Sequence, residues 1–149
     1  MHSTLLILHS YFRWIVLLAG FVAAARMLAG WLRSLPWTES DRRAAVLFTI
    51  ALDVQLLLGI SLFLVSPLIR RAMSDITVAM RTADVRVFVA EHPAIMLLAL
   101  ALAHAGSVVT RKASTDVAKF SRGAICYGAA LLLILFGIPW FRLFATTTG

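Results

Sequence analysis

Long apolar runs, separated by short polar segments, dominate the chain. Four of these runs reach the roughly 20 predominantly apolar residues that a helix needs to cross a bilayer. They cover residues 5–33, 44–67, 90–110 and 120–144. The pattern predicts an all-α fold, an integral membrane four-helix bundle. Because the chain is long enough for one compact bundle and too short for a second unit, we expect a single transmembrane domain over 1–149.

The connections between the runs carry signals for helix ends. Residues 38–41 (TESD) offer N-cap residues for the second helix, and Pro67 helps to close it. Residues 68–86 mix apolar positions with four arginines, which favours a short amphipathic helix at the membrane interface between helices two and three. Pro93 falls in the first turn expected for the third helix, where proline is tolerated.

Composition agrees with a membrane protein whose first partner is the lipid bilayer. Hydrophobic residues make up 61% of the chain and charged residues 14%, whereas a soluble domain is close to half apolar. The formal net charge is +7, but most Lys and Arg residues flank the apolar runs. They therefore indicate membrane topology and argue against nucleic acid as a partner. Cys126 is the only cysteine, which excludes an internal disulfide and a thiolate metal cluster.

The distribution of positive charge predicts the orientation. The connections after the first and third runs hold seven cations: Arg33, Arg42, Arg43, Arg111, Lys112, Lys119 and Arg122. The opposite side holds five: Arg70, Arg71, Arg81, Arg86 and Arg142. Short cytoplasmic loops are enriched in Lys and Arg. We therefore expect both termini outside.

The two halves of the chain resemble each other faintly. One half runs from His9 to LLGI (57–60), and the other from His92 to LFGI (135–138). A repeat of two parallel hairpins would place the first and third helices on opposite corners of the bundle. Because apolar helices look alike, a chance similarity remains the alternative.

Two histidines begin apolar runs at the same face, His9 in the first and His92 in the third. Neutral imidazoles that face each other across a bundle can hold a haem iron by two axial bonds. Arg13 follows His9 by four residues, where it is placed to pair with a haem propionate. Met96, one turn below His92, is a substitute ligand. The alternative is that both histidines lie in the head-group layer and bond to water or lipid.

A second polar layer is expected nearer the inner face. Counted from the expected helix ends at about 1.5 Å per residue, Arg26, Asp53 and His104 fall at nearly one depth. This predicts an Arg26–Asp53 ion pair with His104 beside it and Gln55 near. Such a layer would be either a quinone-head or proton site, or a structural contact that holds three helices in register.

His104 is separated from His92 by twelve residues, about 18 Å along a helix and 120° around it. One iron therefore cannot bind both. His104 is a reserve metal ligand, which would need a second haem.

The chain resembles small four-helix bacterial membrane proteins that are described loosely as cytochrome b. The segments that carry the resemblance are HSYFRW, DVQLLLGISLF, AEHPAIMLLALALAHAG and FGIPW. The architecture is similar to one half of haem A synthase, and the resemblance implies a b-type haem held by His9 and His92 in a bacterial inner membrane. The second helix has no E-x-x-H signature, so haem A synthesis is not implied.

Three functions are compatible with these features. The first is a membrane electron-transfer subunit, rather than a free-standing enzyme, with one b-type haem that exchanges electrons with quinol or a partner subunit of a redox complex. The second is a cofactor-free accessory subunit of a respiratory or photosynthetic complex. A proton or small-solute transporter is the third, although the sequence contains no evident pair of broken helices.

Overall fold

The computed structural model describes residues 1–140, and within them it contains helices and no strand. Four helical segments in this part of the chain are long and apolar enough to cross a membrane: α1 (His2–Leu32), α2 (Glu39–Val65), Ala83–Arg111 and α7 (Asp116–Gly137). The prediction of an all-α membrane bundle is confirmed, and the chain is a multi-pass membrane protein.

The second helix begins where the sequence indicated, at a capping box. The Asp41 carboxylate accepts hydrogen bonds from the Thr38 backbone N–H (2.9 Å) and the Thr38 hydroxyl (2.6 Å). These bonds fix the chain at the entrance to α2. The helix therefore starts at Glu39, five residues before the start of the predicted run at 44. It ends at Val65, before Ser66 and Pro67, because the residue preceding a proline is driven out of the helical conformation.

The third crossing begins earlier than predicted, so the expected start near residue 90 was wrong. It consists of α5 (Ala83–Arg86), a π-helical turn η1 (Val87–Glu91) and α6 (His92–Arg111). Pro93 lies in the first turn of α6, as predicted, but α5 and η1 continue the helical segment before it. The π turn explains how: the His92 N–H bonds to the carbonyl of Val87, and this wider turn accommodates the proline ring and its missing N–H.

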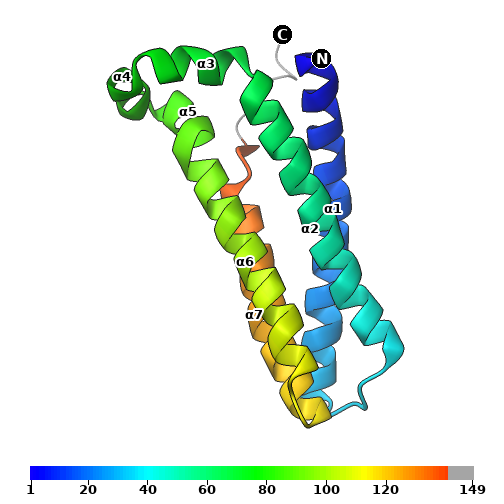
Figure 1. Ribbon diagram of the computed structural model, residues 1–149. Coiled ribbons are helices and arrows are strands. Elements are labelled where there is room, and N and C mark those ends of the chain that lie inside the picture. The colour runs from blue at the N-terminus through cyan, green and yellow to red at the C-terminus, as the bar shows by residue number, and fades with distance from the viewer. Residues whose placement is uncertain (141–149) are drawn as a thin grey trace.

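The connection between α2 and the third crossing is amphipathic, as predicted, but it forms several short helices. α3 (Pro67–Ser74) and α4 (Ile76–Arg81) precede α5. Ser66 and Asp75 accept hydrogen bonds from the first-turn N–H groups of α3 and α4, which explains why one helix is divided. Figure 1 shows this segment at the end of the bundle that carries the N-terminus.

The fourth helix, α7, is shorter than the predicted span of 120–144. It ends at Gly137, because Pro139 holds Ile138 in an extended conformation with φ −72° and ψ 126°. Thr115 caps its start by accepting a hydrogen bond from the Ala118 N–H. Residues 141–144 of the predicted span, and Arg142 with them, lie outside the described residues.

The four crossings form a bundle in which each one packs against two neighbours (Figure 1). α1 packs against α2 and α7, and α6 packs against α7 and, less extensively, α2. α1 and α6 are therefore on opposite corners, as the internal repeat predicted.

Small residues let the helices approach closely. A Cβ added to Gly20 would lie 2.8 Å from the Phe48 ring, and one added to Gly106 would lie 2.8 Å from Cys126. Ala99 and Ala103 are completely buried. These positions serve helix packing in the middle of the bundle.

Candidate functional site

The two predicted histidines meet near the end of the bundle that carries the N-terminus. The ring centres of His9 on α1 and His92 on α6 are 6.2 Å apart, and their planes are inclined by 77°. Both residues are half-buried. The expectation that they approach each other across the core from diagonal helices is confirmed, whereas their role as iron ligands stays a prediction.

His92 is fixed by a backbone carbonyl. Its Nδ1 lies 2.8 Å from the carbonyl oxygen of Gly137 on α7. Because a carbonyl only accepts, Nδ1 carries the proton and Nε2 keeps its lone pair. The same hydrogen bond orients many metal-binding histidines. His92 is therefore held in the tautomer that can bind a metal through Nε2.

His9 is in contact with two residues of α2, Gln55 and Gly59. The Gln55 amide donates to the backbone carbonyl of His9 at 3.0 Å, and its nitrogen lies 3.3 Å from His9 Nε2. The His9 ring also lies against Gly59, where an added Cβ would be 3.3 Å from His9 Cε1. Gln55 was expected in the inner polar layer, and that placement was wrong. α1 and α2 are antiparallel, so the residue of α2 that is level with His9 is Gln55.

Three buried polar atoms around the histidine pair have no hydrogen-bond partner among the described residues. They are His9 Nδ1, Arg13 Nε and Gln55 Oε1. A buried polar atom without a partner costs about 1–3 kcal/mol, so such groups rarely gather in one place without a reason. The cluster marks a site where a polar ligand would be stabilising.

Gly59 and Gly137 are the site residues that the sequence analysis did not single out. Each is the glycine of the repeated motif, LLGI or LFGI, and each lies beside the histidine of its own half of the chain. The repeat therefore contained the signal. The repeat places a glycine beside each histidine. The His9 ring packs against Gly59, whereas His92 bonds to the carbonyl of Gly137.

The other residues predicted near the pair have different surroundings. The Met96 methyl group packs on Gly137, where an added Cβ would lie 2.5 Å away. The Arg13 guanidinium lies 5.5 Å from the centre of the Trp14 ring. Their roles as substitute ligand and propionate partner stay predictions. Glu91, next to His92, forms an ion pair with Arg86 at 2.6 Å.

The predicted Arg26–Asp53 pair was wrong. Arg26 pairs with Asp41 instead, at 2.8 Å, and its Nε donates to the same carboxylate at 3.0 Å. The reason is the early start of α2: Asp53 lies fourteen residues beyond Glu39, about 21 Å along the helix, whereas Arg26 is only about 9 Å from the end of α1 at Leu32. Asp41 is the acidic residue level with Arg26.

Asp53 is paired with His104 across the boundary between α2 and α6. His104 Nε2 lies 2.9 Å from the Asp53 carboxylate, and both side chains are about half exposed, 52% and 46%. The predicted polar layer is therefore two separate pairs at different depths. His104 approaches Asp53 as expected of a polar neighbour, but it does not join Arg26.

Within residues 1–140 no group of three or more His, Cys, Asp or Glu side chains is placed to hold a metal ion. A metal bound by such a cluster is therefore not supported for the described residues. Haem needs only two ligands from the protein, so the absence of a larger cluster does not bear on the predicted role of His9 and His92.

Comparisons with protein-family models, curated proteins and solved structures find no match to this chain. The likeness to cytochrome b-type proteins therefore stays a prediction. What is known of the chain is the fold of a multi-pass helical membrane protein and the geometry of the His9–His92 pair.

Proposed function

We propose that the chain is a membrane electron-transfer protein that binds one b-type haem through His9 and His92. The distance between the two rings carries this proposal. Haem iron can be bound by two histidines, and two imidazoles that would hold one iron must lie close to each other. The observed separation is 6.2 Å.

Direct contact between two aromatic rings also gives centre-to-centre distances of about 4.5–7 Å. The unpartnered atoms favour a ligand over simple contact. His9 Nδ1, Arg13 Nε and Gln55 Oε1 are buried without a partner. A group with polar edges, such as a haem with its propionates, would offer them partners that ring packing does not.

Each residue of the site has a task in this proposal. His92 presents Nε2, because Gly137 holds its Nδ1–H. His9 is the second ligand, and the Gln55 amide holds the backbone of α1 at that point. Arg13 is the counter-charge for a propionate. The bound haem would supply one-electron redox chemistry, and the protein supplies ligands, burial and charge.

The proposal includes a bacterial inner membrane, both termini outside, and quinol or a redox partner subunit as electron donor or acceptor. The orientation is supported by charge. The segments 26–43 and 111–122, which lie at one end of the bundle, contain eight Arg and Lys residues and three acidic residues. By the rule for short loops this end is cytoplasmic, and the histidine pair is then near the outer face.

The test is a reduced-minus-oxidised absorbance spectrum of the purified full-length protein. His9→Ala and His92→Ala should each abolish the low-spin bis-histidine signal. The chain offers two matched controls, His2→Ala and His104→Ala, which should retain it. Haem that survives both site substitutions but disappears with His104→Ala would refute the proposed site.

A cofactor-free accessory subunit is the second candidate, and the Asp53–His104 pair favours it. Both side chains are about half exposed although they lie deep within membrane-spanning helices, where lipid contact with polar groups is unfavourable. Another subunit that covers this pair would remove the exposure. If the wild-type protein, purified from haem-sufficient cells, shows no haem spectrum, the result would favour a cofactor-free accessory subunit.

A further inference from the structure

A cleft of about 310 Å³ lies at the opposite end of the molecule from the histidine pair. It is lined by residues of α2, α6 and α7 and by Trp37 of the connection between α1 and α2. Figure 1 shows that this end of the bundle carries the turns that join α1 to α2 and α6 to α7. Three cationic side chains line it, Arg42, Arg111 and Lys119, and no acidic residue of the described chain does. The cleft is therefore suited to an anion.

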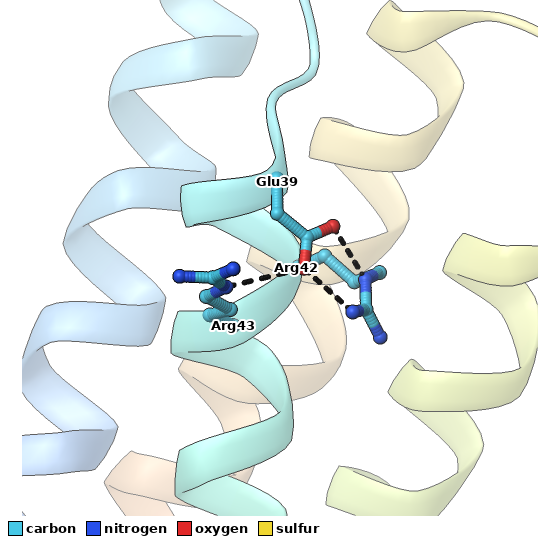
Figure 2. Close-up of polar contacts among 3 residues, drawn as sticks. All are labelled: Glu39, Arg42 and Arg43. Carbon is cyan, nitrogen blue, oxygen red and sulfur yellow. Dashed lines mark hydrogen bonds and ion pairs between the residues drawn. The ribbon is translucent and has the colours of Figure 1, made fainter.

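The carboxylates near the cleft do not neutralise these cations fully. Glu39 binds Arg42 through two bonds of 2.6 and 2.8 Å, but it also binds Arg43 at 3.2 Å. Figure 2 shows the two guanidinium groups on opposite sides of Glu39, so that one negative charge is shared between two positive charges.

Arg111 has the least compensated charge of the three. Its Nε donates to the Ser107 carbonyl of its own helix at 3.2 Å, and no carboxylate of the described residues lies within ion-pair distance. Lys119 pairs with Asp116 at 3.2 Å. Arginine and lysine side chains are the usual partners of phosphate groups in proteins, and the cleft is lined by two arginines and a lysine.

The aromatic and apolar residues that line the rest of the cleft favour a lipid as the ligand. Trp37 lines the cleft and packs against Phe120, with ring centres 5.0 Å apart and planes inclined by 56°. The Lys119 nitrogen lies 5.9 Å from the centre of the Trp37 ring. Tryptophan is characteristic of the head-group level of a membrane. Ala45 and Val46 continue the cleft along the apolar part of α2. A cationic end therefore joins an apolar wall at the depth where phosphate and acyl chain meet.

We propose that this cleft binds the phosphate group of an anionic phospholipid, with the start of an acyl chain against Val46. Basic pockets between transmembrane helices on the cytoplasmic side are known sites for such head groups. The inference does not depend on haem at the other end. Free inorganic phosphate shares the same chemistry and is distinguished by the experiment.

The experiment compares two double variants of equal charge in lipid nanodiscs. Arg42→Gln with Arg111→Gln removes two cations that line the cleft. Arg43→Gln with Lys112→Gln removes two neighbours at the same helix ends that do not line it. Native mass spectrometry measures phosphatidylglycerol retained by full-length protein against a phosphatidylcholine background. The cleft variant should bind phosphatidylglycerol about tenfold more weakly, and the control within about twofold of wild type.

A third variant guards against misfolding. Val46→Trp fills the cleft and leaves every charge in place, so it should also lower phosphatidylglycerol binding while the circular dichroism of the protein stays helical. Equal losses in the two double variants would show a diffuse basic surface and overturn the proposal. Stabilisation by inorganic phosphate in phosphatidylcholine nanodiscs, equal to that by phosphatidylglycerol, would overturn a lipid as the ligand.

Discussion

At the scale of single residues, Asp41 combines two functions that the sequence suggested for different positions. Its side chain is 7% exposed, closes the capping box with Thr38 and pairs with Arg26, which is 42% exposed. Because the arginine reaches solvent or head groups, the ion pair by itself is worth less than a fully buried pair. The cap and the pair together fix the connection between α1 and α2.

Substitution of Asp41 should therefore destabilise more than substitution of its partner. We expect Asp41→Ala to cost about 2–3 kcal/mol, because it removes the cap and leaves Arg26 unpaired, and Arg26→Gln to cost about 1 kcal/mol. The double variant should cost less than the sum, since the residues are in contact. Thermal unfolding in detergent, followed by circular dichroism, measures the three values.

The same unfolding measurement separates this pairing from the one that sequence counting suggested. Arg26→Gln and Asp53→Asn should have additive effects, because the two side chains belong to different pairs. Coupling between Arg26 and Asp53 with additivity between Arg26 and Asp41 would contradict the structure.

At the scale of the helices, glycines decide how closely neighbours approach. A Cβ on Gly30 of α1 would overlap the Phe120 ring of α7, and one on Gly123 of α7 would lie 2.8 Å from the Met27 sulfur. Gly128, also on α7, has open space at the same position. Glycines of the same helix therefore have different roles.

We predict opposite effects for alanine at the two kinds of position. Gly30→Ala should destabilise by about 1–3 kcal/mol, because the methyl group forces α1 and α7 apart against a buried ring. Gly128→Ala should be neutral or stabilise by up to about 1 kcal/mol, because alanine favours the helix and meets no neighbour. Melting temperatures of the purified variants test this; a loss of similar size at both positions would show that glycine flexibility, not contact, matters.

Element boundaries show where the sequence was sufficient and where it was not. Residues 38–41 and Pro67 marked the two ends of α2 by local chemistry, because caps and prolines act on their immediate neighbours, although the apolar run alone placed the start at residue 44. The start of the third crossing was missed because the π turn at Val87–Glu91 allows Pro93 inside a helix. A local proline signal cannot reveal such a compensating turn.

At the scale of the whole molecule, four crossings place the start of α1 and the end of α7 at the same end of the bundle. The turns after α1 and α6 share the other end with an excess of Arg and Lys. This arrangement puts the phospholipid cleft and the histidine pair at opposite membrane faces. Each proposal can therefore be tested without disturbing the other.

A topology reporter provides the test of orientation. Alkaline phosphatase fused after Gly149 should be active, and the same enzyme inserted in the connection between α1 and α2 should be inactive, because that connection is expected in the cytoplasm. The reversed pattern would move the histidine pair to the cytoplasmic face and exclude the proposed position of the haem.

The sequence by itself determined the number of apolar crossings and the fold class, because hydrophobic length is a property of short segments. It also singled out His9 and His92, because polar residues within apolar runs stand out in a sequence. The faint repeat also predicted that α1 and α6 are diagonal, and the packing of the helices agrees. The tertiary structure alone decided which polar residues meet: Arg26 with Asp41, Asp53 with His104, and Gln55 with His9. Pairing between helices depends on their register, and the register follows from the position of each helix end. A shift of five residues in the start of α2 moves every partner along that helix by about 7 Å.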